Sequence, residues 1–310
     1  MLIRVLGSAA GGGFPQWNCN GPLSRAVWAG EGHVTPRTQA SLAVSADGHR
    51  WVLLNASPDL RTQITATPAL QPRRDGPLRN SPIRAVVLTN GDVDAVTGLL
   101  TLRERQPFTL LASARILETL SANSIFNVLD PAVVDRQRLP SEAPMAIIDH
   151  GDDLGLDVEA FAVPGKIALY LEARDTPVPI GTRSGDTIGL AIKERLTGAA
   201  FFYIPSCARM DAMLATRLTG ASLVFFDGTL YEDDELIRQG LLDKTGQRMG
   251  HMSMSGPDGS LSAFASLDVA RKVYIHINNS NPVLSTASQA YRHVRAAGWD
   301  IATDGMEIAL

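Results

Sequence analysis

The sequence predicts an α/β protein built as a four-layer αββα sandwich, and two patterns in the chain support this prediction. Many short apolar segments have the composition of β-strands, and several follow one another without an intervening helix. That order argues against a strictly alternating parallel sheet. Amphipathic segments between and after the strands are typical of helices. Two packed sheets, covered by helices on their outer faces, satisfy both patterns.

The predicted elements recur along the whole chain. Strands are expected at Leu2–Leu6, Ala40–Val44, Trp51–Leu54, Ile83–Leu88, Thr109–Ala112, Ala146–Ile148, Leu156–Val163, Thr187–Ile192, Ala200–Ile204, Leu223–Phe226 and Val273–Ile277. Helices, several of which begin with a Ser, Asp or Thr cap, are expected at Ala95–Glu104, Ala114–Leu120, Asp130–Arg138, Asp211–Leu218, Asp233–Gln239, Ser260–Ser266 and Thr286–Ala297. The Pro-, Arg- and Gly-rich stretch Pro68–Arg79 is interpreted as an exposed loop and not as a linker. We therefore expect a single domain over residues 1–310.

Composition narrows the functional classes. Hydrophobic residues make up 45% and charged residues 19% of the chain, and no apolar run approaches the roughly 20 residues of a membrane-spanning helix. The alternating N-terminal segment lacks the features of a signal peptide, so the cytoplasm is the expected location. The net charge of -4, without a basic and aromatic stretch, argues against nucleic acid as a partner. The two cysteines, Cys19 and Cys207, are too few for a disulfide scaffold or a four-cysteine zinc site.

Four apolar segments end in polar clusters, and buried strands that converge at their ends commonly build a site. The clusters lie in Leu88–Asp94, Tyr203–Cys207, Phe225–Thr229 and Ile275–Asn279. Each cluster also has a structural interpretation, because a carboxylate after a strand can cap a helix or bond to loop backbone, and a buried histidine can be satisfied locally. From spacing alone, capping is the better interpretation of Asp92 and Asp94. The glycine run Gly11–Gly13 lacks the ending of a P-loop and predicts close backbone approach near the site mouth.

The loop after Leu88 resembles the metal loop of the metallo-β-lactamase superfamily, which normally reads His-x-His-x-Asp-His. The corresponding positions here are Asn90, Asp92, Asp94 and Ala95. Further motifs resemble the pyrroloquinoline quinone (PQQ) biosynthesis protein B family. They are Val5–Cys19, Leu54–Asp59, Phe226–Thr229, Met249–His251 and His276–Pro282. The motifs span nearly the whole chain, and their combined specificity is high.

The resemblance implies a metallo-β-lactamase fold and metal-dependent oxygenation of the tyrosine ring in a Glu-Tyr-derived PQQ precursor. On matching positions it assigns Asp94, Asp227 and His276 as ligands of a divalent metal, iron or zinc. Asp92 and His251 are expected to handle protons or support the ligands. For the acidic precursor, Lys166 is favoured as a binding residue over Arg37, Arg61 and Arg103, and Asn279 is expected to contact it as well.

Two departures from the family weaken these expectations. Ala95 stands where family members carry the loop histidine, which removes one strong metal ligand. The family also carries a Cys-x-Cys-x-x-Cys run that, with a cysteine matching Cys207, makes a structural zinc site. Here the run reads Cys19-Asn20-Gly21-Pro22-Leu23-Ser24. No structural zinc is expected, and Cys19 and Cys207 are expected to lie close together as a reduced pair or an adventitious disulfide.

Three functional hypotheses follow. The first is an oxidoreductase of the PQQ pathway with the metal site above. The second is a non-catalytic carrier or transport protein for PQQ or its precursor, with a degenerate metal site. The third is hydrolysis of an ester, lactam or phosphodiester, which normally needs two tightly bound metal ions. The absence of histidines from the metal-loop motif argues against this hypothesis. The expected partner is a small-molecule or dipeptide-like precursor, and a homodimer is compatible with the sequence.

Overall fold

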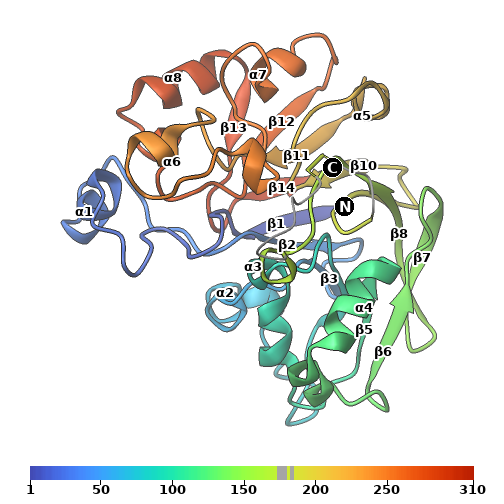
Figure 1. The fold of residues 1–310 in the computed structure, drawn as a ribbon. Helices are drawn as coiled ribbons and strands as arrows, with labels where there is room; N and C mark the ends of the chain where they lie inside the picture. The colour runs from blue at the N-terminus through green and yellow to red at the C-terminus, as the bar shows by residue number, and fades with distance from the viewer. Residues whose placement is uncertain (173–179, 182–184) are drawn as a thin grey trace.

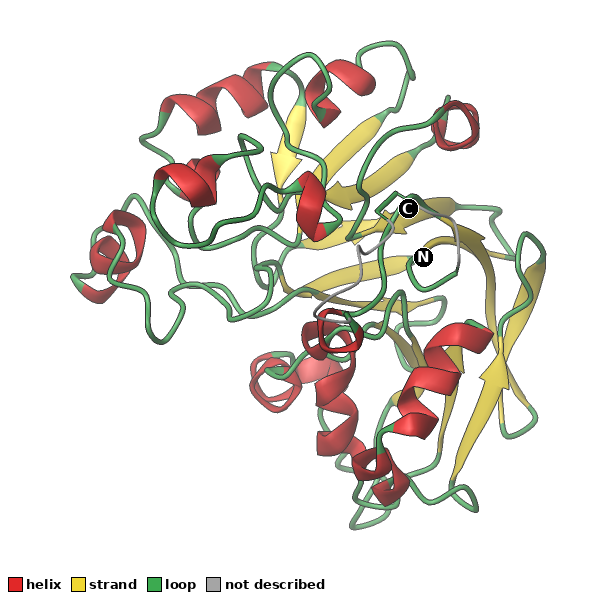
Figure 2. Ribbon diagram, in the orientation of Figure 1, coloured by secondary structure: helices red, strands yellow, loops and turns green. Residues whose placement is uncertain are grey.

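The chain folds into two seven-stranded sheets packed face to face, with helices on the outer side of each (Figures 1 and 2). The computed structural model describes residues 1–172, 180–181 and 185–310. The strand orders are β14-β1-β2-β3-β4-β5-β6 and β13-β12-β11-β10-β9-β8-β7. The predicted αββα sandwich is therefore confirmed.

The bounds of the elements are as follows. The strands are β1 (Leu2–Gly7), β2 (Ser41–Ser45), β3 (Trp51–Leu54), β4 (Ile83–Val87), β5 (Phe108–Ala112), β6 (Val134–Arg138), β7 (Pro144–Asp149), β8 (Asp152–Ala162), β9 (Ile188–Glu194), β10 (Ala200–Ile204), β11 (Leu223–Asp227), β12 (Arg271–Ile275), β13 (Trp299–Ile301) and β14 (Glu307–Ala309). The α-helices are α1 (Pro22–Trp28), α2 (Leu60–Ala66), α3 (Val93–Val96), α4 (Ala114–Ala122), α5 (Ala212–Leu218), α6 (Glu235–Arg238), α7 (Ser260–Ala263) and α8 (Gln289–Ala296). The 3-10 helices are η1 (Pro68–Leu70), η2 (Thr97–Leu102), η3 (Ser124–Val128), η4 (Leu169–Leu171), η5 (Gln247–Met249) and η6 (Pro282–Leu284).

The core lies on both sides of the second sheet, because consecutive strand residues point to opposite faces. Phe225 of β11 belongs to the large apolar cluster shared with the first sheet, which includes Leu53 and Val86. Its neighbour Phe226 belongs to the second cluster, where it packs on Phe264 at a centroid distance of 4.9 Å. Continuous apolar strands such as β11 are thus buried on both faces.

One predicted helix is wrong. Residues Asp130–Arg138 form a turn followed by strand β6, which pairs in parallel with β5 from Val134 beside Phe108 to Arg138 beside Ala112. Intrinsic helix preference is weak, and the free hydrogen-bonding edge of β5 decides the conformation of this segment. The sequence prediction also missed helices α1 and α2 and the short strands β13 and β14.

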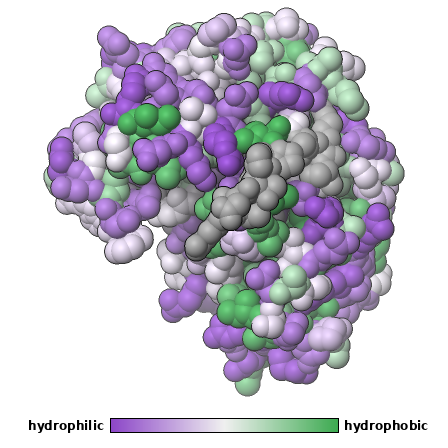
Figure 3. All heavy atoms as spheres, in the orientation of Figure 1, coloured by the Kyte–Doolittle hydropathy of each residue, from purple (hydrophilic) through white to green (hydrophobic). Residues whose placement is uncertain are grey.

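The topology brings the ends of several strands together. Strands β10, β11, β12 and β13 are parallel neighbours, and so are β3, β4, β5 and β6. Their carboxyl ends therefore share one edge of each sheet, where ligands commonly bind in α/β proteins. Among the described residues, the helices are too short or too polar to cross a bilayer. Hydrophilic side chains are spread over the face drawn in Figure 3.

Candidate metal centre

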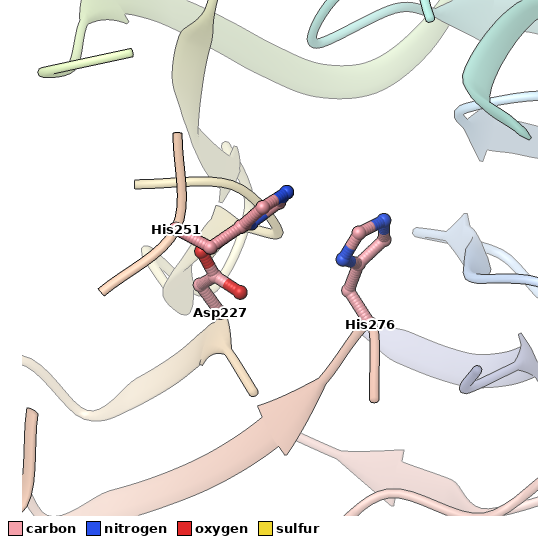
Figure 4. A group of neighbouring side chains, drawn as sticks. All are labelled: Asp227, His251 and His276. Atoms are coloured by element: carbon pink, nitrogen blue, oxygen red, sulfur yellow. The ribbon is translucent and has the colours of Figure 1, made fainter. Parts of the chain in front are cut away.

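Two adjacent strand ends supply the centre. Asp227 is the last residue of β11, and His276 directly follows β12. His251 follows η5, and its ring and the ring of His276 approach the Asp227 carboxylate in Figure 4. Each of the three offers one ligand atom, and these atoms all lie within 4.8 Å of one another. Asp227 is fully buried, and the two imidazoles stack at a centroid distance of 5.1 Å.

Hydrogen bonds hold the Asp227 carboxylate in one orientation. Its Oδ2 accepts from the backbone N–H of Cys207 at 2.9 Å and lies 2.7 Å from His251 Nδ1. Its Oδ1 accepts from the backbone N–H of Thr229 at 3.0 Å and from the Thr229 hydroxyl at 2.7 Å. A carboxylate bonded on both oxygens is well fixed for a role beside a cation.

Thr229 connects the three residues. Its hydroxyl oxygen lies 2.7 Å from Asp227 Oδ1, 3.0 Å from His251 Nδ1, 2.9 Å from His276 Nδ1 and 3.1 Å from the His276 carbonyl oxygen. When the hydroxyl donates to Asp227, it can accept a hydrogen bond from Nδ1 of His276, and Nε2 of the same ring faces Asp94. Fixing a tautomer through the second ring nitrogen is how proteins orient metal-binding histidines.

The contact between His276 and Asp94 tests whether a cation fits. Nε2 of His276 lies 2.8 Å from Asp94 Oδ2. This is a hydrogen-bond distance, so a proton lies between the ring nitrogen and the carboxylate oxygen. His276 also has a φ of 60°, the uncommon left-handed conformation, which costs of order 1 kcal/mol or more. The donor set that fits a divalent cation is the carboxylate of Asp227 with the imidazoles of His251 and His276.

The pKa shifts describe the same centre without a metal. Burial lowers the pKa of His276, but the hydrogen bond and the charge of Asp94 raise it by more, so the net shift is upward. Burial raises the pKa of Asp94, but the hydrogen bond and the charge of His276, with a backbone hydrogen bond and the charge of His251, together outweigh burial, and the pKa is lowered. For Asp92, burial and then the charge of Asp94 raise the pKa. Asp92 is therefore the carboxyl of this loop that takes up a proton more readily.

A cavity of about 810 Å³ opens beside the centre and is lined by Asp92, Asp94, Thr229, His251 and His276 among other residues. The segment around η4 covers the metal loop. The backbone N–H of Leu169 donates to Asp92 Oδ1 at 3.1 Å, and the Tyr170 hydroxyl donates to the Gly91 carbonyl at 2.8 Å. Asp92 thus positions the segment above the site while remaining on the cavity wall.

The glycine run behaves as expected. Gly12 and Gly13 have φ values of 91° and 72°, which favour glycine, and Gly11 lines the cavity. A Cβ atom on Gly11 would lie 3.7 Å from the Asp94 carboxylate. The run brings backbone close to the metal loop at the mouth of the cavity.

The predicted binding residues both line this cavity. Lys166 Nζ pairs with Glu172 at 3.0 Å, and Asn279 donates to Gln16 Oε1 at 2.6 Å while its own Oδ1 is buried and has no partner among the described residues. Arg37, in contrast, is buried and donates to the Ala302 carbonyl.

Both cysteines are free thiols in separate local contacts. The buried Cys207 Sγ donates to the Arg209 carbonyl at 3.1 Å, and Cys19 Sγ accepts from the backbone N–H of Gly21 at 3.3 Å. The pairing expected from the sequence therefore stays a prediction. Ala95 is buried and offers no ligand atom to the centre.

The structure places the site residues predicted from the sequence in a slightly different grouping. Asp227 and His276 lie together, with Asp94 beside His276. His251, expected from the sequence to support the site, is a member of the three-residue group. Thr229 was missed, because a hydroxyl between three ligands has no signature in the sequence. Its position two residues after a strand-ending Asp is the one available signal.

Comparisons with known proteins agree with the fold. The family model for a beta-lactamase superfamily domain matches residues 50–277. A coenzyme PQQ synthesis protein B of Xanthomonas oryzae pv. oryzae is 52% identical over 310 residues, covering 100% of both chains. One from Gluconacetobacter diazotrophicus is 55% identical over 307 residues, covering 99% of this chain and 98% of that protein. The crystal structure of Zn(2+)-bound PqqB from Methylobacterium extorquens superposes with a TM-score of 0.94 at 48% identity and covers 100% of both chains.

Proposed function

The chain belongs to the coenzyme PQQ synthesis protein B family of the beta-lactamase superfamily, and from this premise we propose that it acts in PQQ synthesis as a metal-dependent oxygenase. Its substrate would be the tyrosine ring of a Glu-Tyr-derived precursor. The observation that carries the proposal is the grouping of Asp227, His251 and His276 at the wall of an open cavity. Two imidazoles and one carboxylate with open positions are the donor set of non-haem iron oxygenases.

Asp227, His251 and His276 would hold the metal, with Asp94 beside His276 as an additional carboxylate. A divalent metal bound there would supply Lewis-acid or redox chemistry. The zinc in the Methylobacterium extorquens relative supports a divalent ion, and the donor set accepts either zinc or iron. Thr229 keeps both imidazoles in the ligating tautomer.

Other residues would bind the substrate and move protons. Lys166 and Asn279 line the cavity with a cation and an unpartnered amide oxygen, which suit the carboxylate and the polar backbone of a dipeptide-like precursor. Asp92, whose raised pKa lets it carry a proton, would exchange protons with the ring hydroxyl. The segment from Leu169 to Tyr170 would restrict water over the metal loop.

The test is incubation of the full chain, loaded with either iron(II) or zinc, with a Glu-Tyr substrate under labelled O₂. In hydroxylation, one oxygen atom enters a ring C–H bond as C–OH and the other leaves as water, so the reaction also contains ascorbate as a two-electron donor. The expected product carries one labelled oxygen atom and is lost in His276→Ala. Failure of both metal-loaded forms to produce it, with metal content verified, contradicts the proposal.

A second candidate is a carrier for PQQ or its precursor. The observation in its favour is the buried Ala95, which leaves the loop with fewer ligands than the superfamily motif provides. Calorimetric titration with PQQ distinguishes the two functions. Saturable binding by chelator-treated protein, together with no turnover in the labelled-oxygen experiment, supports the carrier.

A further inference from the structure

Three cations gather around one carboxylate on the wall of the metal-centre cavity. Lys166 Nζ lies 3.0 Å from Glu172 Oε1, Lys244 Nζ lies 3.7 Å from Glu172 Oε2, and Arg248 Nη1 lies 4.0 Å from the same oxygen. All four residues line the cavity, and we call this set the cationic wall. Within the described residues it carries three positive charges against one negative charge. Asp92 and Asp94 line the same cavity, so the excess of positive charge is confined to this wall.

One donor of the cationic wall is unsatisfied. Arg248 Nη1 is buried and has no hydrogen-bond partner in the described part of the chain. Its 4.0 Å separation from Glu172 is too long for a hydrogen bond. Buried polar groups without partners are rare, because each costs about 1–3 kcal/mol. An acceptor arriving with a ligand would satisfy it.

Glu172 stays charged in this environment. Burial alone would raise its pKa, but the hydrogen bond with Lys166 and the charges of the three cations lower it below its ordinary value. Its side chain is only 11% exposed, whereas those of Lys244 and Arg248 are 34% and 39% exposed. The two outer cations are thus accessible from the cavity, and Glu172 holds them together from behind.

The cationic wall adjoins the metal centre. The aliphatic part of Lys166 crosses Gly250, where a Cβ atom would lie 3.1 Å from Lys166 Cγ, and Gly250 has a φ of 90°. Gly250 directly precedes His251. A ligand that reaches the metal centre through this cavity therefore passes the cationic wall.

We propose that the cationic wall is the subsite that binds the carboxylate groups of a ligand whose reacting part lies at the metal centre. The inference rests on the proposed function and adds the residues that bind the carboxylates of its substrate. Arg248 can bind one carboxylate through two parallel hydrogen bonds, and Lys244 can bind a second as a point charge. Glu172 takes the place of the ligand carboxylates when the cavity is free.

The experiment compares two probes that share one ring system. PQQ carries three carboxylates and its trimethyl ester carries none, and both are titrated into the full chain by calorimetry. We expect the wild type to bind the acid at least tenfold more tightly than the ester. Lys244→Gln and Arg248→Gln are each expected to weaken acid binding about tenfold and to leave ester binding unchanged, as removal of a charge-assisted hydrogen bond requires. Lys193→Gln, an exposed charge of the same sign on β9 outside the cavity, should change neither affinity.

A variant that is expected to tighten binding distinguishes an effect on this subsite from a general loss of structure. Glu172→Gln removes the competing carboxylate and is expected to tighten acid binding several-fold, which damage to the fold would not do. Equal affinity of the wild type for acid and ester, absence of binding of both, or weaker acid binding by Glu172→Gln would each overturn the inference. If labelled-oxygen turnover of the Glu-Tyr substrate persists in such a case, the proposed function is retained and the carboxylate subsite is rejected. If turnover is absent while the acid and ester are still discriminated, the subsite stands and the oxygenase proposal fails.

Discussion

Replacement of Thr229 by valine isolates the contribution of one hydroxyl to the metal centre. The side chain is 5% exposed and nearly isosteric with valine, so packing changes little. The substitution removes a hydrogen bond to the Asp227 carboxylate at 2.7 Å and leaves Nδ1 of His276 without its acceptor. A lost hydrogen bond to a charged group costs about 1.5–3 kcal/mol, and a stranded buried donor about 1–3 kcal/mol. We expect a total loss of about 2.5–6 kcal/mol of unfolding free energy, which is the sum of the two contributions.

Metal affinity should fall as well, because the hydroxyl fixes the ring tautomer that presents Nε2. Loss of such a supporting group typically weakens metal binding about 10–100-fold. Urea denaturation of the metal-free protein and chelator competition for zinc measure the two effects. Thr229→Ser keeps the hydroxyl and should retain most of the affinity. Thr109→Val, which removes a buried hydroxyl bonded to Asp149, should cost stability without changing metal affinity. Zinc affinity of Thr229→Val equal to that of the wild type would refute the role assigned to Thr229.

The remaining predictions concern three other positions. Ala95→His should tighten zinc binding about tenfold in chelator competition, because it returns an imidazole beside Asp94, and an unchanged affinity would show that the loop cannot present it. Burial raises the pKa of Glu235 to about 7, so the folded state binds its proton more tightly than the unfolded state and stability falls as pH rises from about 4.5 to 7. Glu235→Gln should remove up to roughly 3 kcal/mol of that pH dependence in urea titrations, and an unaltered pH profile would contradict it. Gly250 has a φ of 90° and packs against the Lys166 side chain, so Gly250→Ala should cost about 1–2 kcal/mol of stability and weaken zinc binding through His251. Gly240→Ala is the control, because Gly240 has a φ of 66° with open space around it and its substitution should cost stability only.

Local patterns in the chain were sufficient for the sandwich and for much of the site. The strand prediction for Trp51–Leu54 matches β3 and that for Ala200–Ile204 matches β10, because continuous apolar segments have few other stable environments. Asp94, Asp227 and His276 all lie in polar clusters after apolar strands, and the family motifs assigned all three as metal ligands. Asp130–Arg138 was assigned wrongly because its conformation depends on pairing with β5, which no local pattern reports.

The order of apolar and polar residues was enough to predict strands, outer helices and polar strand ends, because the burial of an element follows from short-range patterns. The superfamily was predicted from the motifs that resemble it. Which side chains share one centre depended on the folded chain. His251 joins Asp227 and His276 from a loop 24 residues beyond Asp227, and Thr229 links all three through contacts of about 3 Å. Lys244 and Arg248 meet Glu172 across a separation of more than 70 residues. Hydrogen bonds and ion pairs act over a few ångströms, so their partners are chosen by the path of the backbone in space and not by distance along the sequence.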